Sequence, residues 1–214
     1  MNDRLLRVPA EPGRTVPSRR GAPAAEGARL VVVPGLHGSD AAHWQSWLER
    51  QVPGALRVEQ EDWRTPDLAR WSRRVVETVE RAGPGAHVLV AHSFGCLAAA
   101  HALQAGGLES IARVLLVAPA EPAKFGVEAA LPQRPLRCPS TLVASETDPW
   151  MSAASARAWA TRWGCGWVNL GDAGHVNVAS GFGPFPLARD WVEAALRDPT
   201  EVAAPAQEGW RAAA

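Results

Sequence analysis

The sequence predicts an α/β fold, in which a doubly wound, mostly parallel sheet carries helices on both faces. Between Arg29 and Arg197, short apolar runs alternate with longer amphipathic patterns, as is typical of strands followed by helices. Several of the runs are apolar at every position, as expected of parallel strands covered on both faces. Ligand sites of such sheets lie at the carboxyl ends of the strands, so reactive side chains are expected in the loops that follow them.

Each expected element rests on its own run of residues. Short apolar segments predict strands at 29–33, 56–60, 87–91, 113–118, 140–145 and 167–170. Periodic patterns predict helices at 41–51, 67–82, 94–105, 152–163 and 186–197. Asp67 and Ser152 suit N-caps, and Gly83 and Gly164 stand where helices commonly end.

A single domain accounts for most of the chain. Its 214 residues, of which 47% are hydrophobic, suit one core, and we expect residues 28–198 to form it. Residues 1–27 mix Pro, Gly, Arg and Ala without periodicity and predict a disordered leader, while residues 199–214 predict a flexible C-terminal tail. The segment 119–139 leaves no room for a large cap domain, although it is long enough for a modest lid.

Charge and cysteine content exclude several classes of function. The 22 basic and 22 acidic residues give a formal net charge of zero, so neither nucleic acid nor an anionic membrane surface is an expected partner. No apolar run approaches the ~20 residues of a membrane helix and no secretion signal is visible, which predicts a cytoplasmic protein. Cys96, Cys138 and Cys165 match neither a metal motif nor a disulfide framework and are interpreted as free thiols. Nothing in the sequence predicts a metal, an organic cofactor or a particular oligomeric state.

A serine stands at the junction between the predicted strand 87–91 and the predicted helix 94–105. Residues 91–95 read Ala-His-Ser-Phe-Gly, the G-x-S-x-G pattern of a nucleophile elbow with alanine at its first position. Small residues are needed on both sides of the serine because strand and helix approach closely there. The turn would expose the Ser93 hydroxyl and leave the N–H of Phe94 at a helix N-terminus, ready to stabilise an oxyanion. The alternative is that Ser93 only caps the helix.

A nucleophilic serine requires a histidine base and a carboxylate that orients the base, which follow an elbow of this kind in the order serine, acid, histidine. Asp148 comes after the strand 140–145, and Pro149 holds it out of the helical region. We predict Asp148 as the acid. Glu146 and Asp172 are the alternatives, and Asp148 could instead serve only an Asx-Pro turn.

His175 is the predicted base because it lies in the loop after the strand 167–170. His37 is the strongest rival, since it also follows a strand. His87 at a strand start and His101 inside a helix suit packing or surface positions. His92, inside the elbow, is expected to point away from the serine hydroxyl.

The glycine-containing loop 34–39 follows the first strand, where hydrolases with a nucleophile elbow commonly have their second oxyanion donor. We predict that the backbone N–H of Leu36 or His37 fills this role. The His37 side chain and Trp150, which lies close to Asp148 in sequence, are candidates for contact with a substrate. The other tryptophans are expected mainly in the core.

Together these motifs resemble those of the small serine hydrolases related to retinoblastoma-binding protein 9 and their bacterial relatives. The resemblance spans residues 29–191 and is most specific at 174–177 (GHVN) and 180–186 (SGFGPFP), with further motifs at 34–35, 43–47, 62–71, 92–96 and 144–149. It implies an α/β-hydrolase fold with a minimal cap domain or none, and a triad of Ser93, Asp148 and His175. Two positions depart from the pattern: Ala91 replaces the usual glycine, and Phe185 stands where tryptophan is usual.

The resulting hypothesis is a carboxylesterase-like serine hydrolase that cleaves small acyl esters by a Ser-His-Asp acyl-enzyme mechanism. Its partner would be a small-molecule ester held in a shallow pocket. A different class is the main alternative: a non-catalytic or weakly catalytic protein-binding or regulatory module on the same scaffold. A third possibility applies the same triad to lactones or peptides.

Overall fold

The computed structural model describes residues 27–106 and 108–199. The predicted leader, residues 1–27, lies outside this range except for Gly27. The predicted tail, residues 199–214, lies outside it except for Pro199.

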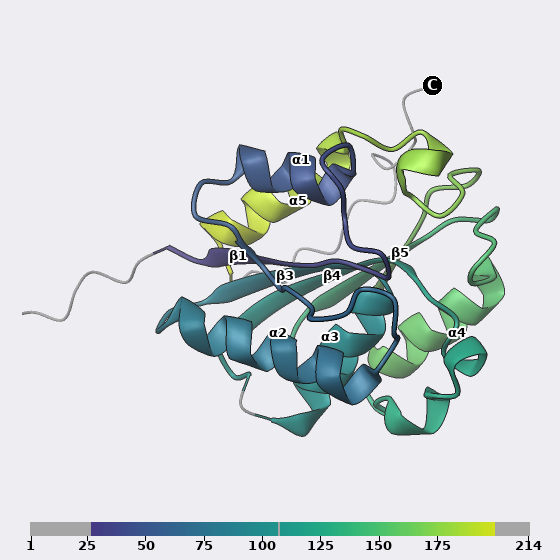
Figure 1. The fold of residues 1–214 in the computed structure, drawn as a ribbon, viewed down its shortest axis with the longest axis horizontal. Helices are drawn as coiled ribbons and strands as arrows, with labels where there is room; N and C mark the ends of the chain where they lie inside the picture. Colours follow the sequence, from purple (N-terminus) through teal and green to yellow (C-terminus); the bar gives the residue numbers. More distant parts are fainter. Residues whose placement is uncertain (1–26, 107, 200–214) are drawn as a thin grey trace, which may run out of the picture.

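Strands and helices alternate along the described part of the chain, as the sequence predicts (Figure 1). The strands are β1 (Arg29–Val33), β2 (Leu56–Arg57), β3 (His87–Ser93), β4 (Ile111–Pro119), β5 (Ser140–Ala144) and β6 (Gly166–Asn169). The α-helices are α1 (Trp44–Gln51), α2 (Leu68–Ala82), α3 (Phe94–Ala105), α4 (Ala153–Trp163) and α5 (Pro186–Arg197). Short 3-10 helices are η1 (Pro122–Phe125), η2 (Glu128–Ala130) and η3 (Val178–Ser180).

All the strand pairs are parallel, and the strand order is β2-β1-β3-β4-β5-β6. The chain first adds β2 on one side of β1 and then continues with β3 on the other side. The order therefore reverses between β1 and β3. Crevices at such reversals, beyond the carboxyl ends of the strands, are where open α/β sheets bind ligands. The carboxyl end of β3 is Ser93.

The sheet separates two apolar layers (Figure 1). Helices α2, α3 and α4 cover one face, and α1 and α5 cover the other. Side chains of a strand alternate between the faces: in β1, Val31 and Val33 join the first layer, and Leu30 and Val32 join the second. Because both faces are covered, every one of these positions is apolar, as the sequence pattern indicated.

The predicted helix ends are confirmed where a cap was identified. Asp67 accepts a hydrogen bond from the N–H of Arg70, and Ser152 accepts one from that of Ser155. Gly83 and Gly164 follow the last residues of α2 and α4 with φ of 81° and 66°, values that glycine adopts without strain.

Two predicted boundaries differ from the structure by three residues, and the other differences are of one or two residues. The first helix was expected from residue 41, but α1 begins at Trp44, because the His43 imidazole accepts a hydrogen bond from the N–H of Gln45 and so acts as the N-cap. The second strand was expected to extend to residue 60. It lies at the edge of the sheet and ends at Arg57, followed by one more bond from the N–H of Val58 to the carbonyl of Val32. None of the helices in the described part of the chain is long and apolar enough to cross a membrane.

Candidate active site

Ser93 occupies the turn between β3 and α3. Its backbone angles are φ 54° and ψ −125°, a positive-φ conformation that residues other than glycine rarely adopt. Such strain costs about 1–3 kcal/mol and persists where the surrounding structure enforces it, often at functional sites. The Ser93 side chain makes no capping hydrogen bond to α3. The alternative in which Ser93 is only a helix cap is therefore wrong.

Close packing against β1 enforces this turn. A Cβ atom at Gly95 would lie 2.4 Å from the carbonyl oxygen of Pro34 and 2.6 Å from that of Val33, so only glycine fits at this position. Ala91, at the other small position of the elbow, is fully buried in β3 and its methyl group is accommodated. The departure from glycine at the first position of the motif thus leaves the turn intact.

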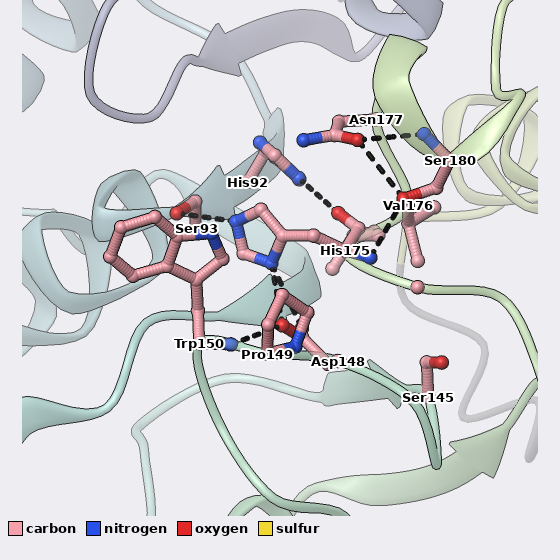
Figure 2. Close-up of polar contacts among 12 residues, drawn as sticks. His92, Ser93, Ser145, Asp148, Pro149, Trp150, His175, Val176, Asn177 and Ser180 are labelled. Atoms are coloured by element: carbon pink, nitrogen blue, oxygen red, sulfur yellow. Dashed lines mark hydrogen bonds and ion pairs between the residues drawn. The ribbon is translucent and has the colours of Figure 1, made fainter.

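His175 lies between Ser93 and Asp148. Its Nε2 is 2.9 Å from the Ser93 Oγ, and its Nδ1 is 2.9 Å from each carboxylate oxygen of Asp148 (Figure 2). Because an ionised carboxylate can only accept, the proton of the neutral imidazole sits on Nδ1, which leaves Nε2 to accept from the hydroxyl. The side chains of His175 and Asp148 are only 8% and 3% exposed, so water scarcely competes for their hydrogen bond.

The alternative acids have other partners. Glu146 accepts a hydrogen bond from the side chain of Asn169, and Asp172 accepts one of 2.7 Å from the Thr147 hydroxyl. Within the described residues, no hydrogen bond joins either carboxylate to His175. The rival base, His37, lines the same pocket but makes no hydrogen bond to Ser93 there.

Hydrogen bonds tie the loop of Asp148 to the loop of His175. The Ser145 hydroxyl donates to the carbonyl of Gly171 and accepts from the N–H of Ala173. Asp148 itself accepts a bond of 2.8 Å from the N–H of Trp150, which closes the turn at Pro149 and orients the carboxylate (Figure 2). The two loops therefore hold the acid and the base at a fixed separation.

The residues on both sides of His175 have positive φ angles. Gly174 has φ 54°, and a Cβ there would lie 2.3 Å from the Ser180 Oγ. That hydroxyl instead accepts a bond of 3.0 Å from the N–H of His175 (Figure 2). Val176 has φ 47°, which is unusual for a β-branched residue. Ser180 was not predicted as a site residue, although it lies in the most specific motif of the sequence.

Comparison with protein families agrees with the arrangement of Ser93, His175 and Asp148. The profile of a family described as "Serine hydrolase" matches residues 30–194. This chain belongs to that serine hydrolase family. No match was found among curated proteins. The narrower resemblance to retinoblastoma-binding protein 9 stays a prediction.

Solved structures show that this serine hydrolase has the α/β-hydrolase fold. A YdeN-like hydrolase from Pectobacterium atrosepticum is 39% identical, with a TM-score of 0.77 over 81% of this chain and 92% of that one. The ydeN gene product of B. subtilis is 18% identical, with a TM-score of 0.64 over 78% of this chain and 97% of that one. Thermogutta terrifontis esterase 2 is 16% identical, with a TM-score of 0.62 over 87% of this chain and 88% of that one. The last two, at such low identity, show the fold alone.

A small pocket of about 150 Å³ opens onto Ser93 in this hydrolase. Leu36 and His37 line it from the loop after β1, and Ala120 and Phe125 line it from the segment between β4 and β5. The described lining residues include no Asp, Glu, Lys or Arg. The pocket thus suits an uncharged group.

The segment between β4 and β5 closes one side of the pocket, where a modest lid was expected. Lys124 in η1 donates hydrogen bonds of 3.0 and 2.9 Å to the carbonyls of Pro149 and Trp150. Its ammonium lies 5.6 Å from the centre of the Trp150 ring, and that ring in turn is 6.1 Å from the His175 ring. Of the tryptophans in the described residues, Trp150 is the one that lines the pocket.

Three backbone N–H groups, those of Leu36, His37 and Phe94, were predicted as candidate oxyanion donors. The N–H of His37 donates to the carbonyl of Trp63 at 2.9 Å, so it is already used. No hydrogen bond within the described residues uses the N–H of Leu36, which lies next to Gly35, the residue packed against Ser93. The N–H of Phe94 lies at the N-terminus of α3, where orphan donors stabilise negative charge. These contacts favour Leu36 over His37.

Two further histidines border the pocket, and both are neutral near pH 7. Burial lowers the pKa of His43 to about 4. Burial also lowers the pKa of His92 well below its usual value, and the neighbouring His175 and His43 add to that shift. Among the described residues, no group of three or more His, Cys, Asp and Glu side chains is arranged to hold a metal ion.

Proposed function

We propose that this serine hydrolase cleaves small, uncharged acyl esters through an acyl-enzyme formed on Ser93. The observation that carries the proposal is the pair of 2.9 Å contacts that join the Ser93 hydroxyl to the His175 imidazole and the imidazole to the Asp148 carboxylate. A chain of hydroxyl, imidazole and carboxylate is the arrangement that activates a serine for acyl transfer.

In the first half of the reaction, the Ser93 Oγ attacks the ester carbonyl while His175 Nε2 takes the hydroxyl proton. The imidazolium carries a proton on each nitrogen, and Asp148 stabilises its charge through Nδ1–H. The N–H groups of Phe94 and Leu36 donate to the oxygen of the tetrahedral intermediate. When the intermediate collapses, His175 gives its Nε2 proton to the alcohol, which leaves, and Ser93 keeps the acyl group.

Water completes the cycle by the same steps. His175 takes a proton from a water molecule, whose oxygen attacks the acyl carbon. The second intermediate expels the Ser93 oxygen, which recovers its proton from His175, and the carboxylic acid is released. The small pocket without charged lining residues supports a short, uncharged acyl group as the substrate.

The test is labelling with a fluorophosphonate probe, followed by hydrolysis of p-nitrophenyl esters of graded chain length. Wild type is expected to label and to hydrolyse the short esters, and Ser93→Ala to do neither. Ser155→Ala is the matched control, because Ser155 lies on α4, outside the pocket, and should behave as wild type. If wild type neither labels nor hydrolyses any ester, the protein-binding alternative replaces this proposal. Equal labelling of Ser93→Ala would exclude Ser93 as the nucleophile.

A further inference from the structure

Two buried side chains donate hydrogen bonds to consecutive carbonyl groups of the His175 loop. His92 Nε2 lies 3.0 Å from the carbonyl oxygen of His175 (Figure 2). Trp44 Nε1 lies 2.9 Å from the carbonyl oxygen of Val176. His92 comes from the end of β3 and Trp44 from the first turn of α1, so two separate elements hold this loop.

The contact of His92 defines the form of its ring. A carbonyl oxygen can only accept, so His92 Nε2 carries a proton. His92 is 5% exposed, and burial keeps its pKa well below the usual value, so the ring is the neutral Nε2–H tautomer. The ring stays a donor toward the carbonyl throughout the neutral pH range. This also explains why His92 points away from the Ser93 hydroxyl.

The contact of Trp44 is rigid because the indole is fully enclosed. The Trp44 ring meets the Phe185 ring edge to face at 5.5 Å and the His92 ring at 6.0 Å. The next residue, Gln45, donates from its side chain to the carbonyl of Val33, at the end of β1, and to that of Val90, in the middle of β3. The start of α1 is therefore fixed to β3, which carries the elbow, and to its neighbour β1.

The His175 loop needs such support, because its backbone is strained at Val176, the residue next to the proposed base. Val176 has φ 47°, and it directly follows His175. If the carbonyls of residues 175 and 176 were released, the peptide could relax and carry the imidazole away from its 2.9 Å contact with Ser93. Displacing a reacting group by about 1 Å can reduce a rate about 100-fold.

We propose that His92 and Trp44 are positioning residues, which hold the backbone of His175 and Val176 so that the imidazole stays in line with the Ser93 hydroxyl. The inference rests on the proposed function of the His175 and Ser93 pair. It gives a role to the His-Trp-Gln motif at 43–45 and to the histidine of the elbow, neither of which enters the acyl-transfer steps.

Trp44→Phe tests the proposal, since it removes the N–H donor and keeps an aromatic ring in the core. We expect kcat for a short p-nitrophenyl ester to fall about 10- to 100-fold with KM nearly unchanged. Trp163→Phe is the matched control: Trp163 is equally buried, and its indole donates to the carbonyl of Pro132 at 3.0 Å, away from the His175 loop. Melting curves establish that both variants are folded at the assay temperature. Equal kcat values for the two variants would overturn the proposal.

A pair of substitutions at residue 92 provides an independent comparison. His92→Leu removes the donor, whereas His92→Gln keeps an N–H group that can reach the same carbonyl. We expect His92→Gln to recover most of the kcat that His92→Leu loses. Identical kcat values for the two variants would contradict a role for the hydrogen bond.

The rates of amide hydrogen exchange in residues 174–180 report on the same contacts without depending on turnover. Exchange there should become faster in Trp44→Phe and in His92→Leu than in wild type and Trp163→Phe. A wild type that fails to react with a fluorophosphonate would refute the proposed function, yet exchange would still decide whether the two donors hold the loop. Unchanged exchange in both variants would refute the positioning role.

Discussion

Gly35 and Ser93 lie so close together that a Cβ atom added to Gly35 would stand 2.7 Å from the Cβ of Ser93. The same added atom would lie 3.1 Å from the carbonyl oxygen of His92, in the backbone of the elbow. The loop after β1 and the elbow after β3 therefore constrain each other across the point where the strand order reverses. The second candidate oxyanion donor, Leu36, is adjacent to Gly35 in the chain and shares this constraint.

Gly35→Ala adds a single methyl group, but it should reduce activity strongly. The methyl group must push the Ser93 backbone or the Leu36 loop outward, which would separate the proposed nucleophile from its proposed oxyanion donors. We expect kcat to fall about 100-fold and the free energy of unfolding to fall by about 1–3 kcal/mol. Gly27→Ala is the control, because nothing lies within 4 Å of a Cβ there. Ester hydrolysis and urea unfolding measure the two effects, and wild-type kcat in Gly35→Ala would contradict this account.

Replacing Asp148 by Asn should abolish most turnover while leaving the fold intact. An amide can present its NH2 group to Nδ1, which favours the tautomer with the proton on Nε2 and disables His175 as a base toward Ser93. A loss of about 10⁴-fold in kcat is expected, from the effect of this substitution in a serine protease triad. Asp172→Asn and Glu146→Gln, the two alternative acids, should stay within a few-fold of wild type. Steady-state kinetics on a short ester would reveal a misassignment if either of these lost more than Asp148→Asn.

The fold followed closely from patterns in the sequence. The parallel strands could be predicted because β1 and β3 are apolar at most positions, and the helix ends because Asp67 and Ser152 cap by local hydrogen bonds. The sequence pattern predicted the end of an element less well where a contact between residues distant in sequence determines that end. The edge strand β2 ends at Arg57, which donates to the Glu49 carboxylate of α1, and no periodicity could reveal that pair.

In the candidate site too, some features could be predicted from the sequence and others could not. Ser93, Asp148 and His175 could be named from sequence because each stands at or beyond the carboxyl end of a strand, and parallel topology brings such ends to one edge of the sheet. The contacts of Trp44 with the carbonyl of Val176 and of His92 with that of His175 span 132 and 83 residues. Backbone carbonyls leave no trace in residue identity, so only the resemblance to a family motif pointed to Trp44.

Trp150 should limit the length of the acyl chain. The residue is 48% exposed, and its ring lines the pocket and lies beneath Lys124, so Trp150→Ala opens one wall at little cost in stability. We expect the preferred p-nitrophenyl ester to become longer, with kcat/KM for the shortest ester reduced. Trp167→Ala is the control, because Trp167 also lies beside a cation, Arg157, but outside the pocket. An unchanged chain-length profile in Trp150→Ala would show that another wall sets the limit.

His43 should make the protein lose stability in mild acid. Its pKa is about 4 in the folded protein, against the usual 6.5 expected for the unfolded chain, so the unfolded state binds the extra proton first. The contribution of neutral His43 to the free energy of unfolding is therefore fully present above about pH 6.5 and declines as the pH falls toward 4. Buried His92, whose pKa is also lowered, acts in the same direction.

His43→Asn isolates this effect, because asparagine is a good N-cap for α1 and does not titrate. Urea unfolding at about pH 7 and about pH 4.5 should show that the variant loses about 2 kcal/mol less than wild type between the two conditions. The residual loss in the variant includes the contribution of His92, whose pKa burial also lowers. If wild type and His43→Asn lose the same free energy over this interval, the imidazole of residue 43 takes up its proton in the folded state as readily as in the unfolded chain, and burial does not control its charge.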